Sequence, residues 1–515
     1  MPQPQYTSAS SPIAFRRNNG GLNSTHSPLS VADGESSKLL NVDFDESGVV
    51  KKRKGYTRLN TSAFNSGATW NGLHYYEKAD DTSFLVGTCG NKFAKMDSLD
   101  GTFDDVTGSI TITAGNNNHC DFITHVDTVV GTNGVDLVFK WTGSGNASVL
   151  DGINAGTASP SITKAKFIEV FSNYTVVANV TDSGTALPSR LYWSTIDTIE
   201  TWSASDFRNV GLDDGQIITG LKTLGRSLVI FKDSSIWVAS FTGDRSLPFV
   251  FERTRSNVGC ISGYSIQTVA NGLIFLSQDG YYFFDGQNST KISDRIRKTL
   301  NDDYNKTRFV NSVSAYLNSE NRYIGSFTKS GNTTHDSNIT FDAQNNAFSK
   351  YEGLNANVMA IANVSGVEKL YFGDYAGFVY LANNGNDDYP SGVRTAIESY
   401  YYTKWIDFED VINNKGIESI VIYYRINEAT LTITHSYEFE DGDEYSQTFS
   451  MSAGGSLYGT GTFDSSTYSA SGGKLKVLQL TGRGRLVRIG FKNNVIGETF
   501  ILDGFGLLAY LEGHK

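Results

Sequence analysis

The stretch Gly272–Phe284 reads GLIFLSQDGYYFF, in which an apolar run, a short polar turn and an aromatic run follow one another. Both runs have the length and composition of β-strands, and the residues between them, which include Asp279 and Gly280, are typical of a tight turn. The pattern therefore predicts a β-hairpin. Whether it recurs along the chain decides the fold.

The same strand-turn-strand pattern occurs seven times. The other six units pair residues 84–87 with 92–94, 128–131 with 136–139, 175–178 with 191–193 after a long insertion, 227–231 with 235–238, 322–325 with 338–341, and 368–372 with 377–380. Successive units begin 44 to 52 residues apart, which is close to the ~40–50 residues of a four-stranded propeller blade. Closing such units into a ring buries the apolar face of each sheet against its neighbours. The repeat predicts a β-propeller of about six to eight blades, and the alternative is a run of unrelated hairpins.

The rest of the chain also has an all-β pattern. Residues 1–19 are polar and aperiodic and predict a flexible arm, and residues 20–60 predict a β-hairpin segment whose turn at 45–48 uses the positive φ that Gly48 permits. The propeller is expected at 61–390, and a C-terminal antiparallel β-sandwich at 391–515. The strands of this sandwich are expected at 403–408, 419–425, 430–439, 445–450, 475–480, 486–491 and 499–510, with mobile loops at 454–461 and 465–473.

Composition excludes several classes of protein. The formal net charge of −11 over 515 residues is opposite to that of a sequence-specific nucleic-acid binder. Three widely spaced cysteines imply no disulfide framework, so folding in a reducing compartment is expected. The N-terminus lacks the pattern of a signal peptide, and no apolar stretch reaches the ~20 residues of a membrane helix.

Motifs that carry chemistry are absent. The sequence contains neither a phosphate-binding Gly-rich loop with its Lys-Ser/Thr end nor a Gly-x-Ser-x-Gly nucleophile turn. His119, Cys120 and His125 are close in sequence, but no fourth ligand with zinc-like spacing accompanies them, so ordinary strand residues are the favoured interpretation. We therefore expect a structural protein, with no catalytic residues, cofactor or metal.

One basic cluster is conspicuous in this acidic chain. It is either a solvated strand or turn, or a docking surface for an acidic partner or for passing DNA. The candidate interaction residues are Arg16, Arg17, Lys51, Lys52, Arg53 and Lys54.

Two sets of residues resemble the nozzle proteins of short-tailed bacteriophages, also called tail tubular protein B. The first is the N-terminal string Gly20-Gly21-Leu22-Asn23, Gly34-Glu35, Leu40-Asn41-Val42-Asp43, Gly48-Val49 and Arg53-Lys54-Gly55-Tyr56. The second set lies between residues 228 and 293 and includes Leu228-Val229-Ile230-Phe231, Val258-Gly259-Cys260, Asp279-Gly280-Tyr281 and Phe284-Asp285-Gly286. Together these residues cover about a third of the chain.

The resemblance implies a β-propeller virion protein that is assembled in the host cytoplasm and forms a ring, typically of six subunits, at the distal end of the tail. The ring would contact the tail adaptor and the fibres or spikes, meet the bacterial envelope at its tip, and close or conduct the path of the genomic DNA. The alternative function is a carbohydrate-binding or glycan-degrading β-propeller. A hydrolase needs two carboxylates in one cleft, and a lectin-like array needs equivalently placed aromatic residues, which the six tryptophans do not provide.

Overall fold

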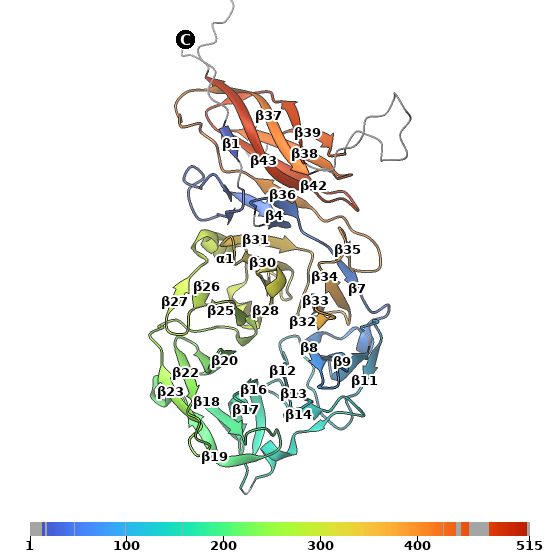
Figure 1. Ribbon diagram of the computed structural model, residues 1–515, viewed down its shortest axis with the longest axis vertical. Helices are drawn as coiled ribbons and strands as arrows, with labels where there is room; N and C mark the ends of the chain where they lie inside the picture. Colours follow the sequence, from blue (N-terminus) through green and yellow to red (C-terminus); the bar gives the residue numbers. More distant parts are fainter. Residues whose placement is uncertain are drawn as a thin grey trace, which may run out of the picture. The chain divides into compact units, whose positions relative to one another are not determined.

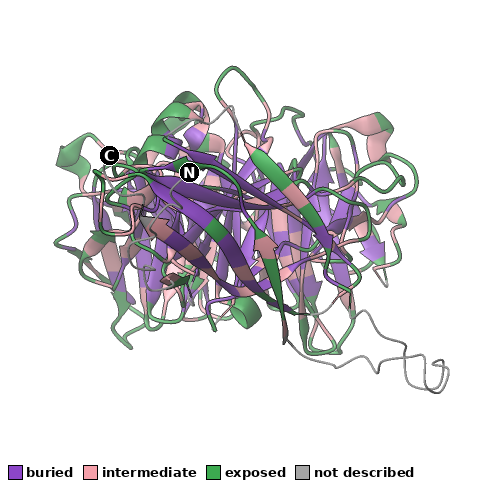
Figure 2. Cartoon of the chain, turned by 90° about the horizontal axis from the view of Figure 1, so that it is seen from above, coloured by how far each residue is buried: buried purple, intermediate pink, exposed green. Residues whose placement is uncertain are grey.

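The computed structural model of the protein describes most of the chain. The described residues are 13–15, 18–45, 47–97, 99–156, 158–425, 427–438, 444–452 and 473–511. Strands make up 51% of the described residues and helices 7%, so the all-β prediction is confirmed. Buried residues follow the strands, and exposed residues gather at the turns (Figure 2). Among the described residues, no helix is long and apolar enough to cross a membrane.

The chain forms two compact units (Figure 1). Unit 1 comprises Met1–Tyr56, Ile339–Gly353 and Asn383–Lys515, and unit 2 comprises Thr57–Asn338 and Leu354–Ala382. These bounds differ from the predicted domains, because the N-terminal segment clusters with the C-terminal strands and 339–353 separates from the repeat region.

Seven antiparallel sheets follow one another in chain order through the described residues of unit 2 (Figure 1). Five have four strands each: β8 (Trp70–Glu77), β9 (Ser83–Cys89), β10 (Lys92–Asp97), β11 (Phe103–Asp105); β12 (Asp121–His125), β13 (Thr128–Thr132), β14 (Phe139–Trp141), β15 (Ser148–Val149); β16 (Ile162–Phe171), β17 (Tyr174–Asp182), β18 (Thr185–Ser194), β19 (Trp202–Asn209); β20 (Ile218–Leu224), β21 (Ser227–Lys232), β22 (Ile236–Phe241), β23 (Phe249–Arg253); and β24 (Gln267–Val269), β25 (Gly272–Ser277), β26 (Gly280–Phe284), β27 (Ser289–Lys291).

The sixth and seventh sheets complete the series. In unit 2 the sixth contains β28 (Val313–Leu317) and β29 (Arg322–Phe327), and the seventh contains β32 (Val358–Val364), β33 (Val367–Gly373) and β34 (Val379–Ala382). The short helix α1 (Arg297–Asp302) lies between the fifth and sixth sheets in sequence.

The seven predicted units correspond to the second and third strands of these sheets. In the fifth sheet, for example, β25 pairs with β26 and Leu276 lies opposite Tyr281. The predicted insertion in the third unit is wrong, because β17 and β18 continue as a long hairpin that closes where Asp182 lies opposite Thr185. No residue of the segment 181–190 is fully buried, so it lacks the apolar alternation of a strand with one face in the core.

The first strands of the seven sheets contact one another in the order β8, β12, β16, β20, β24, β28 and β32, and β32 in turn contacts β8. Apolar clusters lie between neighbouring sheets. One of them joins Trp70 and Leu85 of the first sheet to Ala360 and Tyr371 of the seventh. The chain also links these two sheets, since the Leu59 N–H donates to the Val379 carbonyl at 2.9 Å. Each sheet therefore buries its apolar faces against the sheets beside it.

Unit 1 contains two larger sheets. One has the order β40-β37-β43-β6-β5, with β1 on β43 and β41 on β37, and the other has the order β39-β38-β42-β36-β4. Phe505 and Phe491, one from each sheet, pack with ring centroids 5.3 Å apart. The bounds are β1 (Ile13–Phe15), β4 (Lys38–Leu40), β5 (Val42–Phe44), β6 (Val50–Lys52), β36 (Ser399–Tyr402), β37 (Lys415–Arg425), β38 (Thr430–Tyr437), β39 (Tyr445–Ser450), β40 (Gly473–Gln479), β41 (Arg483–Gly484), β42 (Val487–Asn493) and β43 (Ile501–Leu511).

Unit 1 also holds shorter elements: β2 (Gly21–Leu22), β3 (Glu35–Ser36), β31 (Ala347–Glu352) and β35 (Asp388–Tyr389). The predicted turn at 45–48 is confirmed, because β5 pairs with β6 and Gly48 has a φ of 87°. The predicted flexible arm is wrong at Ile13–Phe15, which pairs with β43. The strand predicted at 403–408 is also wrong, because β36 ends at Tyr402 and only Ile406 forms a bridge beyond it. The loops expected at 454–461 and 465–473 lie outside the described residues, apart from Gly473.

Candidate functional site

The six basic residues do not form one exposed surface. Arg16 and Arg17 lie outside the described residues. Lys54 is exposed and Lys51 is half-buried, but Lys52 and Arg53 are each only 2% exposed. The prediction of a docking surface is therefore wrong for Lys52 and Arg53, because both side chains bind partners inside unit 1.

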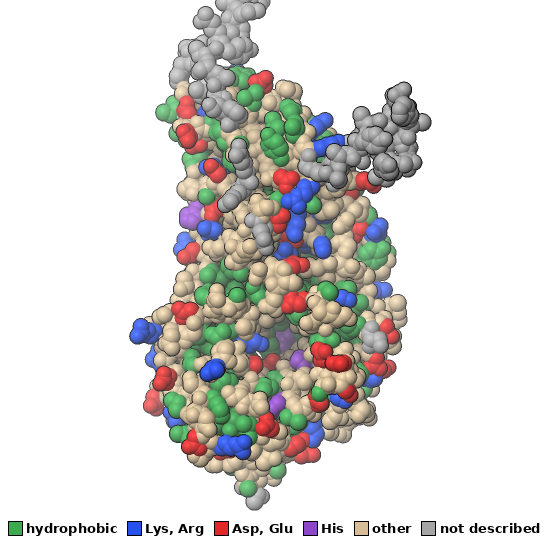
Figure 3. Space-filling view, viewed as in Figure 1, with side chains coloured by type: hydrophobic (Ala, Val, Ile, Leu, Met, Phe, Trp, Pro, Cys, Tyr) green, Lys and Arg blue, Asp and Glu red, His purple; other side chains and the backbone are tan. Residues whose placement is uncertain are grey.

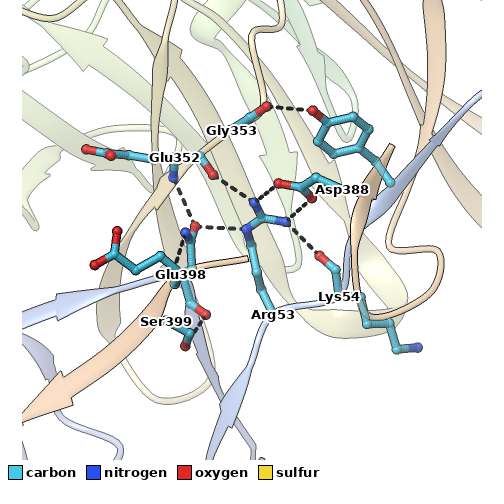
Figure 4. A network of polar contacts seen from close by, with 9 residues as sticks. Arg53, Lys54, Glu352, Gly353, Asp388, Glu398 and Ser399 are labelled. Atoms are coloured by element: carbon cyan, nitrogen blue, oxygen red, sulfur yellow. Dashed lines mark hydrogen bonds and ion pairs between the residues drawn. The ribbon is translucent and has the colours of Figure 1, made fainter. Parts of the chain in front are cut away.

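Arg53 is the centre of a buried polar network (Figure 4). Its Nη1 and Nη2 donate to the two carboxylate oxygens of Asp388 at 2.8 and 2.6 Å, and its Nε donates to Asn41 Oδ1 at 2.8 Å. The same guanidinium donates to the carbonyls of Glu352 and Lys54 at 2.7 and 3.0 Å. The side chains of Arg53 and Asp388 are 2% and 9% exposed, so this bidentate pair is formed away from solvent.

Asn41 extends the network to further segments. It has a φ of 54°, a conformation that Asn tolerates better than most residues. Its Oδ1 also accepts from the Glu352 N–H, its Nδ2 donates to the Glu398 carbonyl at 2.8 Å, and its own carbonyl accepts from Ser399 Oγ at 3.0 Å. The network thereby joins segments of unit 1 that lie more than 300 positions apart in the sequence.

Other residues of the N-terminal string are also structural. Gly55 lies so close to Asp387 that a Cβ at this position would meet the Asp387 carbonyl oxygen at 1.7 Å. The Tyr56 hydroxyl donates to the Gly353 carbonyl at 3.0 Å, and Asn23 Nδ2 donates to Glu35 Oε2 at 2.7 Å. These residues of the N-terminal string thus make their contacts inside unit 1.

Lys52 lies beside this network. Its ammonium donates to Asn493 Oδ1 at 2.8 Å. Burial lowers the pKa of Lys52 to about 8, although the carboxylates of Asp387, Glu498 and Asp388 favour the charged form.

A second candidate site is a cavity in unit 2 of about 170 Å³. Figure 3 shows this unit hollowed near its centre, with histidine, acidic and basic side chains around the hollow. The first strands supply most of its polar lining, which includes Asn71, His74, His119, Asp121, Glu169, Lys222, Gln267 and Ser314. Sequence reasoning missed the cavity. Six of these residues, at 74, 121, 169, 222, 267 and 314, are separated by 45 to 53 positions, so the repeat applied to polar residues would have found them.

The ionisable groups of the cavity are perturbed by burial. It raises the pKa of Asp121 to about 7 and also raises the pKa of Glu169. The nearby Lys222 ammonium acts in the opposite direction on both carboxyl groups. Burial lowers the pKa values of His74 and His119 to about 4, so both imidazoles are neutral at pH 7.

Hydrogen bonds hold several of these groups in place. Asp121 Oδ2 accepts from the Ile168 N–H at 3.0 Å. His74 Nε2 lies 2.8 Å from Thr124 Oγ1, and His119 Nε2 lies 3.2 Å from Asn357 Oδ1. Because Asn357 Oδ1 is an acceptor, His119 carries its proton on Nε2 in this arrangement. The cavity is therefore a pre-ordered polar site.

The cavity does not form a zinc site in the arrangement considered from the sequence. His119 and Cys120 line it, but His125 bonds instead to Thr175 Oγ1 at 2.7 Å. No cluster of three or more potential metal ligands occurs within the part of the chain that the structure describes. All three cysteines are unpaired and buried, as the absence of a disulfide framework predicted. Burial raises the pKa of Cys120 to about 12, which leaves its thiol unreactive at neutral pH.

Comparisons with known proteins give no functional assignment. No protein-family model matches the chain, and no curated protein matches it. Among solved structures, the computationally designed protein Ika8 is similar over 63% of this chain and 99% of its own, with 10% sequence identity and a TM-score of 0.36. A similarity at that level supports no argument about this chain.

Proposed function

We propose that unit 2 is a seven-bladed β-propeller, that unit 1 is a β-sandwich completed by N-terminal strands, and that the chain is a structural subunit of a bacteriophage tail. The most specific form of the proposal is the nozzle ring at the distal end of a short tail. Seven consecutive sheets whose first strands contact one another support the propeller. Two sheets that pack through Phe491 and Phe505 support the sandwich.

The observation that carries the virion role is the position of the N-terminal residues that resemble nozzle proteins. Arg53, Asn41, Gly55 and Tyr56 lie in one buried network of unit 1. A pattern that is shared for structural reasons places its residues in such contacts, whereas a catalytic pattern would place reactive groups in a cleft. The network therefore favours a structural protein, without enzymatic activity or cofactor.

In this proposal the subunit acts as one member of a homo-oligomeric ring, typically of six copies, in the virion. Its partners are the tail adaptor, the fibres or spikes, the genomic DNA in transit and, at the tip, the bacterial envelope. The cavity of about 170 Å³ has room for a few small groups and not for a duplex, so the DNA path would lie between copies in the ring. A net charge of −11 suits a passage through which a polyanion slides.

The experiment is to locate the chain in virions. Purified phage particles are analysed by mass spectrometry, and an antibody against the chain is imaged on them by electron microscopy. The proposal predicts that the chain is present at several copies per particle and that the antibody labels the tip of the tail. Its absence from purified particles, or label confined to the head, would overturn the proposal.

A glycan-degrading propeller is the second candidate function, because Asp121 and Glu169 bring two carboxyl groups into one cavity. Glycosidases use such a pair as acid and as base or nucleophile. The test is hydrolysis of polysaccharides from the bacterial envelope by the purified chain and by the variants Asp121→Asn and Glu169→Gln. Activity that either substitution abolishes would replace the structural proposal with this one, and no hydrolysis by the unsubstituted chain would reject it.

A further inference from the structure

Three charged side chains from three consecutive sheets meet at the cavity of unit 2. Asp121 belongs to β12, Glu169 to β16 and Lys222 to β20. The Lys222 ammonium acts on both carboxyl groups and on His74 as a neighbouring charge. It forms no hydrogen bond or ion pair with any residue that the structure describes. The two signs of charge therefore face one cavity without neutralising each other by direct contact.

Asn71 contributes a second, independent observation. Its side chain lines the same cavity and is only 1% exposed. Its Oδ1 lies 3.3 Å from Asn357 Nδ2, but its own Nδ2 is buried without a hydrogen-bond partner among the described residues. A buried polar group left unpaired costs about 1–3 kcal/mol. A ligand acceptor in the cavity toward which the Asn71 amide turned would remove that cost.

We propose that this cavity binds a small zwitterion of the free α-amino acid class. The ammonium of the ligand would face Asp121 and Glu169, and its carboxylate would accept from the Lys222 ammonium and the Asn71 amide. A simple anion would leave the two carboxyl groups of the protein without a cation in contact, and a simple cation would leave Lys222 without an anion. A ligand with both charges satisfies all of these groups at once.

The size of the cavity limits the ligand. A volume of about 170 Å³ is below the ~300–1,000 Å³ of pockets for drug-sized molecules. Glycine and alanine are small enough to be suitable probes for such a space. The inference does not depend on the virion role, because a monomer and a ring subunit contain the same cavity.

The test is isothermal titration calorimetry on the full chain near neutral pH. The probes are glycine and alanine, with acetate and methylammonium as ligands that each carry one of the two charges. We expect saturable binding of an amino acid that is at least about tenfold tighter than that of either single-charge ligand, since a charge-assisted hydrogen bond contributes about 1.5–3 kcal/mol. Lys222→Met and the isosteric Glu169→Gln should each weaken binding about tenfold or more.

Lys164→Met is the matched control, because Lys164 lies on β16 but is exposed and does not line the cavity. It should leave the affinity unchanged. The proposal is overturned if neither amino acid gives saturable binding at concentrations up to about 10 mM, because the binding free energy would then be weaker than ~3 kcal/mol. Equal affinity for acetate, or unchanged affinity in folded Lys222→Met and Glu169→Gln, would overturn it as well.

Discussion

Replacing Arg53 by Met should destabilise unit 1 strongly. The substitution removes both hydrogen bonds to the Asp388 carboxylate and the bond to Asn41 Oδ1, and it leaves a buried carboxylate without its cation. Removing one partner of a buried ion pair costs about 3–5 kcal/mol. By contrast, Lys54→Met changes the neighbouring exposed residue and should cost less than about 0.5 kcal/mol.

Hydrogen exchange measured on peptides is the suitable assay, because a chain of two units need not unfold in one step. A loss of 3–5 kcal/mol corresponds to roughly 150- to 5,000-fold faster exchange of the protected amides in β5, β6 and β31. Peptides from unit 2 should exchange as in the unsubstituted chain.

The double variant Arg53→Met/Asp388→Leu provides the internal control. Because the double variant removes the unpaired Asp388 carboxylate together with the guanidinium, it should recover much of the stability lost in Arg53→Met. An Arg53→Met variant whose unit 1 peptides exchange less than about fivefold faster, equivalent to ~1 kcal/mol, would refute the reasoning.

Two further substitutions test the described contacts. Gly55→Ala should destabilise unit 1 by about 1–3 kcal/mol or more, because the new Cβ would meet the Asp387 carbonyl oxygen at 1.7 Å. Gly506→Ala is the control and should be close to neutral, since a Cβ at Gly506 would lie 3.4 Å from its nearest neighbour. Denaturant unfolding measures the stability of both variants. Asp121→Asn should stabilise unit 2 at pH 8 and change little at pH 4. Burial raises the folded-state pKa of Asp121 from 3.8 to about 7. The charged or titratable neighbours of Asp121 are Glu169, Lys222 and Tyr264. Because the folded state holds the proton more tightly than the unfolded state, the stability of unit 2 falls as pH rises from about 4 to 7. Unfolding curves of both proteins across that range check the sign, and a variant whose gain is the same at pH 4 and pH 8 would contradict the assignment.

The repeat could be predicted because its central strands are apolar on both faces. Residues 272–276 and 281–284 are buried between neighbouring sheets except for the half-buried Phe283, so they form continuous apolar runs that a search for periodicity detects. The first strands escaped detection for the opposite reason. In β8 the polar residues Asn71 and His74 face the cavity, and β24 has only three residues.

The set of chain segments that form unit 1 could not be predicted, because the contacts of this unit join distant parts of the sequence. Lys52 binds Asn493, which is 441 positions away, and Arg53 binds Asp388, which is 335 positions away. A run of basic residues is typical of a solvated surface when such partners are not known. The cavity residues, in contrast, recur with the repeat and could have been found from the sequence.

The mass of the purified chain in solution, combined with electron microscopy of the same sample, tests the central proposal most directly. The subunit has a mass of 56.3 kDa, so a six-membered ring would have a mass of about 338 kDa. The proposal predicts closed rings, formed by the chain alone or on addition of the tail adaptor protein. A particle that remains at 56.3 kDa under both conditions would contradict it.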